Sequence, residues 1–273
     1  MENQNCNVVV LVACMHQVDK TILKRLNIQS SFVVINQCDN DKVEECEITS
    51  LNGDCFRGIF VNTKERGLSK SRNMAIKYAP SGSLCLICDD DEELADNYPS
   101  MISNAYKELS EADVITFNVN YKTERYNYKK QYIKNTRLGF QELLKVSSFQ
   151  ITFKRDKVLE NDIYFDEKMG SGTGNGGGEE NRFLLDCRSK HLKIWGVPEL
   201  LATIVPSGRS QWFSGFNKDY FVTYGWSTRR MLGFCLGYAY IWYNSINHRN
   251  LYCQELNLFQ VIKAFHKGFF QKR

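Results

Sequence analysis

Residues 83–91 read SLCLICDDD, an uninterrupted apolar run followed at once by three aspartates. A strand that is apolar at successive positions is buried on both faces, which is typical of a parallel sheet covered by helices. Similar runs occur at 8–14, 31–37 and 55–62. Helical stretches at 19–26 and 67–79 separate these runs, so the order predicts repeated strand–helix–strand units. We therefore predict an α/β fold with a mostly parallel central sheet and helices on both faces.

The second half of the chain continues the pattern with interruptions. The residue types predict helices at 97–109 and 179–187, and strands at 113–119 and 148–153. Residues 121–137 are dense in Tyr, Lys and Asn without a helical period, which predicts a surface hairpin or loop. Residues 170–178 contain six glycines in nine positions. Because so many glycines disfavour both helix and strand, we expect a mobile loop there.

Composition limits the class of protein. A chain of 273 residues with 43% hydrophobic content can bury one main core. We expect a catalytic domain over residues 1–205 and a helical, aromatic and basic region over 206–273. The formal net charge of +4 is far from the excess of a nucleic-acid binder, so no nucleic-acid partner is expected. The N-terminus lacks the basic leader of a signal sequence, and we expect a cytoplasmic protein.

The cysteines do not indicate a disulfide framework. Ten of them are scattered along a chain far longer than the small secreted domains that depend on disulfides, so we interpret them as reduced thiols. Cys85 and Cys88 form a CxxC, but they lie within the apolar run, where a strand directs them to opposite faces. A zinc site would need a second pair of ligands, which the sequence lacks.

The C-terminal region changes character. Residues 231–243 are mostly apolar and aromatic, but they are fewer than the roughly 20 residues that a membrane-crossing helix needs. Residues 256–273 form a basic, Phe-rich amphipathic stretch. One interpretation is a helix that lies on anionic lipid at the inner face of the membrane. The other is that residues 231–243 belong to the core or to a contact in a homo-oligomer.

Asp89, Asp90 and Asp91 are the most informative residues. Adjacent carboxylates repel one another and strands disfavour Asp, so this cluster has a local cost that a divalent cation would offset. At the carboxyl end of a parallel strand the side chains face the crevice where such sheets bind ligands. Oxygen ligands of this kind suit Mg²⁺ or Mn²⁺ together with substrate phosphates. The alternative is a solvated acidic turn before the next helix.

Residues 66–73, reading RGLSKSRN, open a predicted helix. Gly67 allows close backbone approach, the helix N-terminus favours anions, and Arg72 adds a directed charge for a diphosphate. An ordinary helix capped by Ser69 is the alternative.

Residues 176–183, reading GGGEENRF, bring a glycine loop directly into two glutamates. Capping favoured by the helix dipole is one explanation of Glu179 and Glu180. The other is that one of them deprotonates an acceptor hydroxyl while the loop closes over the substrates.

Over residues 7–200 the chain resembles glycosyltransferase family 2, the inverting group with the GT-A fold. The G-x-S-x-S-R-N element, the DDD and the EE pair match the family's motifs in order. MHQ at 15–17, NQ at 36–37 and FDEK at 165–168 resemble bacterial members that assemble surface polysaccharides and O-antigens. The resemblance implies a Rossmann-like sheet and the following donor-binding residues: Ala13, Asn36, Gln37, Asp39, Gly67, Ser69, Arg72, Asn73, Asp89 and Asp90.

The resemblance also implies how these residues act. Asp91, with Asp89, would hold Mn²⁺ or Mg²⁺, and Glu180 or Glu179 would be the catalytic base. The expected enzyme is a hexosyltransferase that moves a sugar from a nucleotide diphosphate sugar, preferably a UDP-sugar, to a glycan or lipid-linked oligosaccharide. Two other classes stay open: a sugar nucleotidyltransferase and a catalytically inactive sugar- or nucleotide-binding module. The nucleotidyltransferase should carry a Gly-rich signature near the first strand, and residues 13–20 contain no Gly.

Overall fold

The computed structural model describes residues 7–49, 53–121, 131–205 and 215–271. Its strands are β1 (Val8–Met15), β2 (Ser31–Gln37), β3 (Lys42–Thr49), β4 (Cys55–Thr63), β5 (Leu84–Cys88), β6 (Glu92–Leu94), β7 (Val114–Tyr121), β8 (Thr136–Arg137), β9 (Ile151–Lys154) and β10 (Ile194–Ile204). Its helices are α1 (Thr21–Arg25), α2 (Leu68–Tyr78), α3 (Tyr98–Glu108), α4 (Phe140–Leu143), α5 (Arg155–Glu160), α6 (Glu179–Ser189), α7 (Lys218–Asn247) and α8 (Leu258–Phe269), with 3₁₀ turns η2 (Ser148–Gln150) and η3 (Arg249–Leu251).

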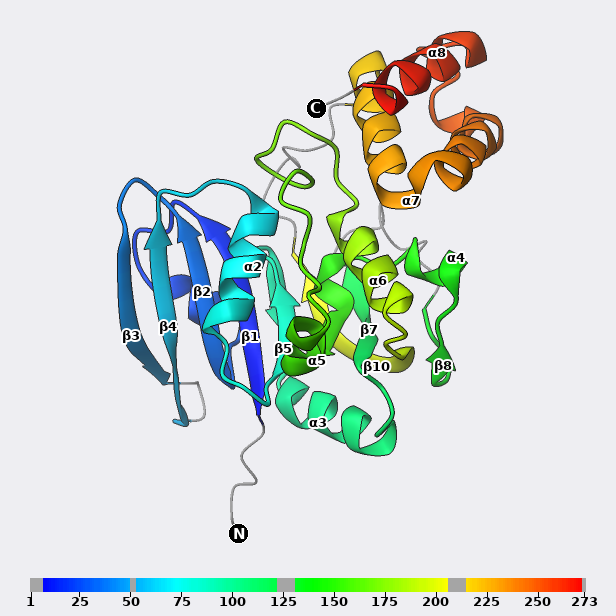
Figure 1. Cartoon of the computed structure of the whole chain (residues 1–273). Coiled ribbons are helices and arrows are strands. Elements are labelled where there is room, and N and C mark those ends of the chain that lie inside the picture. The colour runs from blue at the N-terminus through cyan, green and yellow to red at the C-terminus, as the bar shows by residue number, and fades with distance from the viewer. Residues whose placement is uncertain (1–6, 50–52, 122–130, 206–214, 272–273) are drawn as a thin grey trace.

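One sheet runs through the α/β part in the order β3-β4-β2-β1-β5-β9-β7-β10-β6, and β8 pairs with β10 (Figure 1). The pairs β1–β2, β1–β5, β2–β4 and β7–β10 are parallel. Strands β3, β6, β8 and β9 run the opposite way. The expected α/β fold with a mostly parallel central sheet is confirmed.

Helices cover both faces of this sheet. The apolar side chains of β1 are buried on both faces and show this arrangement. Val8, Val10 and Val12 pack into one cluster with residues of α1 and α3. Val9 and Leu11 pack into a second cluster with residues of α2, α5 and α6. The alternation of side chains along a strand therefore gives two separate cores from one continuous apolar run.

The predicted elements up to α3 lie within a few residues of the observed ones, and the later part differs more. The strand predicted at 148–153 begins as η2 and becomes extended only in β9. Strands β3, β6 and β10 were not predicted. β3 alternates charged and apolar residues and pairs antiparallel with β4 at the sheet edge. The segment 170–178 contains neither helix nor strand, as expected, and much of the predicted hairpin at 121–137 lies outside the described residues.

The C-terminal helices pack on each other around a small core of their own (Figure 1). Helix α7 is broken at Gly233, whose φ of +73° suits glycine. Helix α8 crosses α7 closely, because a Cβ on Gly268 would lie only 1.8 Å from the carbonyl oxygen of Val222. None of the described helices has the length and apolar character needed to span a bilayer. The junction between the two predicted domains falls at residues 206–214, outside the described residues, so that division stays a prediction.

Candidate active site

The acidic end of β5 lies among the carboxyl ends of the parallel strands, since β5 pairs with β1. The chain turns back directly after the strand, because the main-chain N–H of Asp89 donates a 2.7 Å hydrogen bond to Oε1 of Glu92. Glu92 is only 2% exposed, and its burial, with the charge of Asp89, raises its pKa well above the ordinary value. This glutamate shapes the aspartate turn, a role that its position in the sequence did not reveal.

The three aspartates have different surroundings. Asp89 accepts a 2.8 Å hydrogen bond from Nη2 of Arg72 and a 2.9 Å bond from the hydroxyl of Ser148. No described cation forms an ion pair with Asp90 or Asp91. Burial, followed by the charges of Asp89 and Asp90, raises the pKa of Asp91 to about 6, and burial and Asp89 also raise the pKa of Asp90. The two later carboxylates are therefore the ones left for a ligand.

Arg72 joins the acidic strand end to the start of α6. Its side chain is 2% exposed; Nη2 contacts Asp89, and Nη1 donates a 3.0 Å hydrogen bond to Oε1 of Glu179. The guanidinium also lies over the ring of Phe165, 5.4 Å from its centroid. Burial alone lowers the pKa of Arg72, but the two carboxylates outweigh it and raise the pKa above the ordinary value. The arginine stays charged and bridges two segments that are 90 residues apart in sequence.

The two glutamates of α6 differ in the same way as the aspartates. Glu179 is buried and paired with Arg72, and Gly170 is required beside it, since a Cβ there would lie 2.9 Å from its carboxyl carbon. Glu180 is partly buried and has no ion pair with any described residue. Burial, and then the charge of Glu179, raises the pKa of Glu180 to about 8, although Arg72 acts in the opposite direction. The sequence favoured Glu180 as the base and kept Glu179 as the alternative; in the structure only Glu179 forms an ion pair.

The helix motif at 67–73 holds the glycine loop against α2. The main-chain N–H of Leu68 donates to the carbonyl oxygen of Ser171 at 2.9 Å, and the hydroxyl of Ser69 donates to that of Met169 at 2.8 Å. Asn73 exchanges hydrogen bonds with the main chain of Phe165, at 2.9 and 2.8 Å. In this structure the motif therefore contacts its own chain. Its expected contacts with the donor stay a prediction.

Of the residues expected to bind the donor, three lie toward the carboxyl ends of β1 and β2. Asn36 is buried and holds the segment after β1, because its amide exchanges 2.9 Å hydrogen bonds with the main chain of Gln17. Gln37 accepts a 2.8 Å bond from the N–H of Gly67. Ala13 is buried within β1, in register with Ile35 of β2. Asn36 and Gln37 therefore hold neighbouring segments in place, and Ala13 lies beside them in the sheet.

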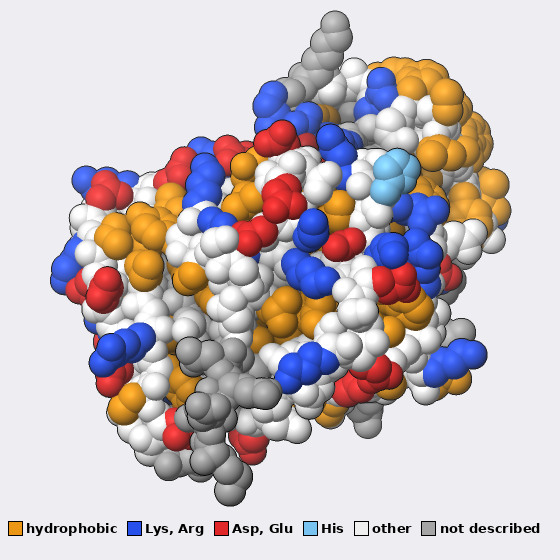
Figure 2. All heavy atoms as spheres, turned by 60° about the horizontal axis from the view of Figure 1, so that its bottom comes forward, with side chains coloured by type: hydrophobic (Ala, Val, Ile, Leu, Met, Phe, Trp, Pro, Cys, Tyr) orange, Lys and Arg blue, Asp and Glu red, His pale blue; other side chains and the backbone are white. Residues whose placement is uncertain are grey.

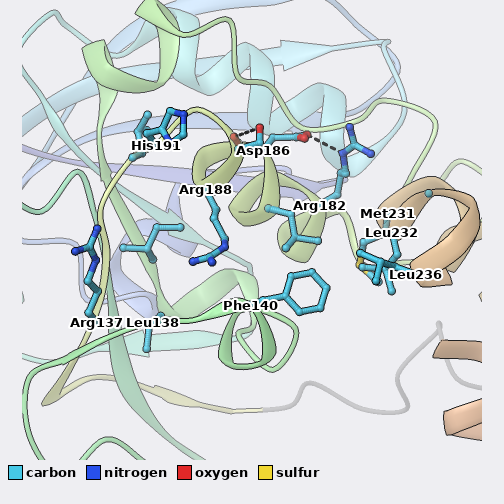
Figure 3. Close-up of a pocket in the computed structure, with 15 residues that line it drawn as sticks. Arg137, Leu138, Phe140, Arg182, Asp186, Arg188, His191, Met231, Leu232 and Leu236 are labelled. Atoms are coloured by element: carbon cyan, nitrogen blue, oxygen red, sulfur yellow. Dashed lines mark hydrogen bonds and ion pairs between the residues drawn. The ribbon is translucent and has the colours of Figure 1, made fainter. Parts of the chain in front are cut away.

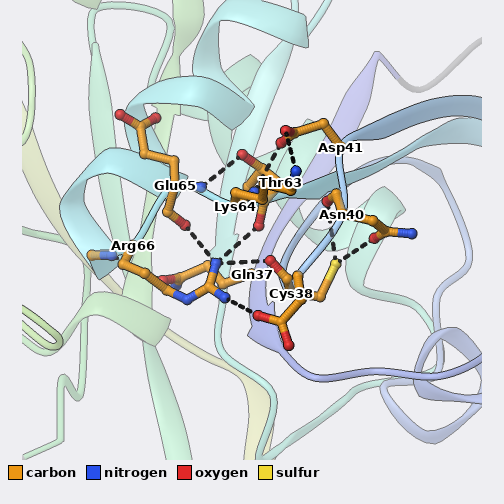
Figure 4. Close-up of polar contacts among 10 residues, drawn as sticks. Gln37, Cys38, Asn40, Asp41, Thr63, Lys64, Glu65 and Arg66 are labelled. Carbon is orange, nitrogen blue, oxygen red and sulfur yellow. Dashed lines mark hydrogen bonds and ion pairs between the residues drawn. The ribbon is translucent and has the colours of Figure 1, made fainter.

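Asp39 is the exposed residue of this group. Its side chain is 93% exposed and forms a 2.8 Å ion pair with Arg66. Arg66 also donates to the carbonyl oxygens of Cys38 and Thr63, which fixes the loop after β2 against the end of β4 (Figure 4). In the sequence Arg66 stands out only as the first residue of a motif, because its contacts depend on a loop about 27 residues away.

The donor set of the site fits a hard divalent cation. Asp90 and Asp91 offer carboxylate oxygens, which Mg²⁺ and Mn²⁺ prefer. The charge of Arg25 lowers the pKa of both, but burial and the neighbouring aspartates outweigh it, and neither forms an ion pair with a described residue. Among the described residues, no group of three or more His, Cys, Asp or Glu side chains is arranged to hold a metal ion. Mg²⁺ commonly binds through one or two carboxylates and completes its coordination with substrate phosphates and water. The residues therefore fit a metal that binds together with a diphosphate.

Comparison with known proteins identifies the family and the fold of the chain. The family model described as Glycosyl transferase family 2 matches residues 18–165, and no curated protein matches the chain. Among solved structures, the chain is similar to residues 1–349 of S. aureus TarS, with a TM-score of 0.63, 14% identity, and coverage of 96% of this chain and 81% of that one. The same TarS fragment in complex with UDP-GlcNAc gives a TM-score of 0.64 at the same identity and coverage. At this identity the likeness establishes the GT-A fold. Since the family model spans more than half of the sequence, from before α1 to Phe165 beside Arg72, the chain belongs to glycosyl transferase family 2.

Proposed function

We propose that this protein is a metal-dependent, inverting glycosyltransferase that moves a sugar from a UDP-sugar to a glycan acceptor. The observation that carries the proposal is the buried Arg72, whose two ion pairs bring the aspartate turn and the start of α6 to one site. Each of the two segments that Arg72 joins also carries a carboxylate with a raised pKa and no ion pair to a described residue: Asp91 in the turn and Glu180 in α6. Sugar transfer needs one group for the leaving diphosphate and another for the acceptor hydroxyl.

The choice of donor rests on Asp39 and on the similar structures. The TarS fragment has been solved with UDP-GlcNAc and with UDP, which supports a UDP-sugar here. In this chain Arg66 holds the exposed carboxylate of Asp39 after the end of β2. There the carboxylate could accept a hydrogen bond from the uracil of the donor. Asn36 and Gln37 are occupied by the protein itself, so we assign them to building the crevice.

We assign Asp91, together with Asp90, to binding the metal at the diphosphate of the donor. Mg²⁺ or Mn²⁺ held there would neutralise the charge that develops on the leaving diphosphate. Asp89 is already paired with Arg72 and Ser148, so its role is to position the turn. Arg72 is likewise a positioning residue, because both of its terminal nitrogens contact carboxylates.

Glu180 is assigned as the base that takes the proton from the acceptor hydroxyl. Its pKa of about 8 lies close to working pH, where general base catalysis is most efficient. Glu179 cannot take this role without breaking its bond to Arg72 inside a buried pair. Attack on the sugar then comes from the side opposite the diphosphate, which inverts the anomeric centre by single displacement.

The test compares Glu180→Gln with Glu179→Gln. Glu180→Gln should bind the donor as the wild type does, measured by calorimetry, but lose transfer by about 10²- to 10⁴-fold, the usual contribution of a general base. Glu179→Gln should instead lower stability and donor affinity together, because it removes a partner of Arg72. Full transfer by Glu180→Gln, with an inactive but stable Glu179→Gln, would assign the base to Glu179. Donor binding without transfer by the wild type, over a panel of acceptors, would favour an inactive binding module.

The acceptor is proposed to be lipid-linked, in surface polysaccharide synthesis at the inner face of the membrane. Hydrophobic side chains gather over the C-terminal helices at the upper right of Figure 2. The exposed apolar residues of this C-terminal surface are Phe234, Leu236, Trp242, Tyr243, Ile246, Leu251, Phe259 and Phe270. On α8, Lys263 and Lys267 lie between Phe259 and Phe270 on the same exposed face. Aromatic and basic residues on one face suit the boundary of an anionic bilayer.

Co-sedimentation with anionic and with neutral liposomes tests this surface. The protein should bind anionic vesicles at low salt, and the double variant Lys263→Glu/Lys267→Glu should bind them at least about tenfold more weakly, since each basic residue contributes about 1 kcal/mol near the surface. If the wild-type protein stays in the supernatant with anionic vesicles at low salt, the proposed membrane binding is wrong. Transfer to a soluble acceptor would then be the function that remains.

A further inference from the structure

A cavity lies beside α6, apart from the residues proposed for the donor and for catalysis. Its volume is about 720 Å³, and it lies between the later turns of α6, the segment 137–140 and the middle of α7. Figure 3 shows Arg188 and Phe140 reaching into the same space, with Leu232 and Leu236 across from them. None of the proposed donor or catalytic residues lines this cavity.

The cavity carries positive charge that no ion pair among the described residues neutralises. Arg182 lines it but is paired with Asp186 at 2.8 Å. Arg137 and Arg188 are exposed, and neither forms an ion pair with a described residue. After the paired charges cancel, two guanidinium groups remain in the lining. Guanidinium groups bind phosphate oxygens through two parallel hydrogen bonds, so an anionic ligand is the complement.

The remaining lining is apolar and continues out of the cavity. Phe140, Leu232 and Leu236 line the space. Leu236 is 59% exposed and follows Phe234 at the start of the C-terminal surface defined above. One end of the cavity is therefore cationic, and the other leads onto an apolar surface. A soluble sugar or a free inorganic ion would use only part of this lining.

We propose that this cavity binds the phosphate of a lipid-linked acceptor, with the first part of the lipid chain along Phe140 and α7. The proposal rests on the glycosyltransferase function proposed above and deepens it. Arg188 lies eight residues after Glu180 on α6, which is about 12 Å along the helix. The lipid phosphate is thus held away from the base, and the glycan between them spans the distance to Glu180. Arg137 and Arg188 bind the phosphate, while Leu232 and Leu236 contact the chain.

Direct binding tests the proposal without donor or transfer. The probe is a short-chain prenyl phosphate, with the matching prenol and inorganic phosphate as comparisons, titrated into the full-length protein. The double variant Arg137→Glu/Arg188→Glu should bind the prenyl phosphate at least about tenfold more weakly than the wild type, because two charge-assisted contacts are lost. Lys190→Glu is the matched control: it reverses a charge at the same end of α6 but does not line the cavity, so its affinity should equal that of the wild type.

Three results would overturn the proposal. They are equal affinity of the wild type and the double variant, an equal loss of affinity in Lys190→Glu, and equal affinity for prenol and prenyl phosphate. Inorganic phosphate that binds as tightly as the prenyl phosphate would make this a site for a soluble phosphate instead. Leu236→Asp is a second variant, which should lower the affinity for the prenyl phosphate but leave the affinity for inorganic phosphate unchanged. These experiments measure binding alone. A failure of the proposed acceptor site is therefore distinguishable from a failure of the proposed transfer reaction, which Glu180→Gln tests.

Discussion

Replacing Arg72 by Met should destabilise the fold as strongly as any single change in the α/β part. Arg72 is 2% exposed and has two carboxylate partners, Asp89 and Glu179. A charge-assisted hydrogen bond contributes about 1.5–3 kcal/mol, so two of them give about 3–6 kcal/mol. Removing one partner of a buried ion pair costs about 3–5 kcal/mol, because the charge that remains is uncompensated. We therefore expect Arg72→Met to lower the free energy of unfolding by about 3–5 kcal/mol.

Urea unfolding at pH 7.5, followed by tryptophan fluorescence, measures this loss. Glu179→Gln alone should cost about 1.5–3 kcal/mol. The double variant Arg72→Met/Glu179→Gln should cost less than the sum of the two, because the glutamine leaves no buried charge at that position. Their coupling energy should be about 1–3 kcal/mol, the range for residues that share one network. The matched control is Arg57→Met, which breaks an exposed ion pair with Glu47 and should leave the unfolding midpoint unchanged.

Two outcomes would contradict this reasoning about Arg72. One is a midpoint for Arg72→Met that equals that of Arg57→Met. The other is a double variant whose cost equals the sum of the single costs, which would mean that Arg72 and Glu179 act independently. Arg72→Lys separates charge from geometry: one ammonium cannot reproduce the planar fork that contacts both carboxylates, so stability should fall only partly while transfer falls further.

Three further changes have defined outcomes. The kcat/KM for transfer should rise with pH and level off above about 8, because Glu180 acts as a base only when ionised; a profile that is flat from pH 6 to 9 would exclude it. Asp91→Asn should weaken Mn²⁺-dependent binding of UDP at least about tenfold in calorimetry while metal-free binding stays the same; equal losses with and without metal would contradict the assignment. Gly176→Ala would place a Cβ 2.2 Å from the hydroxyl of Ser227 and 2.9 Å from the carbonyl oxygen of Thr223, so it should cost about 1–3 kcal/mol of stability by thermal unfolding, whereas Gly177→Ala, whose Cβ would meet nothing closer than 3.7 Å, should lose less.

The first half of the fold could be predicted because its strands are buried on both faces. Runs such as 31–37 and 84–88 have no polar alternation, and only a covered parallel sheet accommodates them. β3 could not be found in this way, because half of its positions face water at the edge of the sheet. β10 contains Gly196 and Pro198, and its register with β7 shifts twice. Irregular strands of this kind depend on tertiary pairing that no local pattern shows.

The candidate site was predicted at the level of motifs but not of pairings. Acidic triplets and paired glutamates are visible in sequence because they are locally unfavourable. Which carboxylate is neutralised depends on where Arg72 lies, and that is set by the packing of α2 against β1 and β2. Ser148 and Glu92 were missed for the same reason: each contacts Asp89 only after the chain has turned back. A serine hydroxyl gives no local signal of such a contact.

The acidic residues of the candidate site fall into two groups: those that pair with Arg72, and those that form no ion pair with a described residue. Asp89 and Glu179 are stabilised by Arg72, whereas Asp91 and Glu180 have raised pKa values. A raised carboxyl pKa means that the folded protein binds protons more tightly than the unfolded chain, so stability falls as pH rises from the unfolded value near 4 to the folded pKa. For Asp91 that window ends at about 6, and for Glu180 at about 8. At neutral pH the fold therefore bears the cost of the ionised Asp91 and part of the cost of ionising Glu180. A cation at Asp91 would offset the first cost, and a proton taken from an acceptor hydroxyl would relieve the second, so the two proposed steps of transfer are those that stabilise the site.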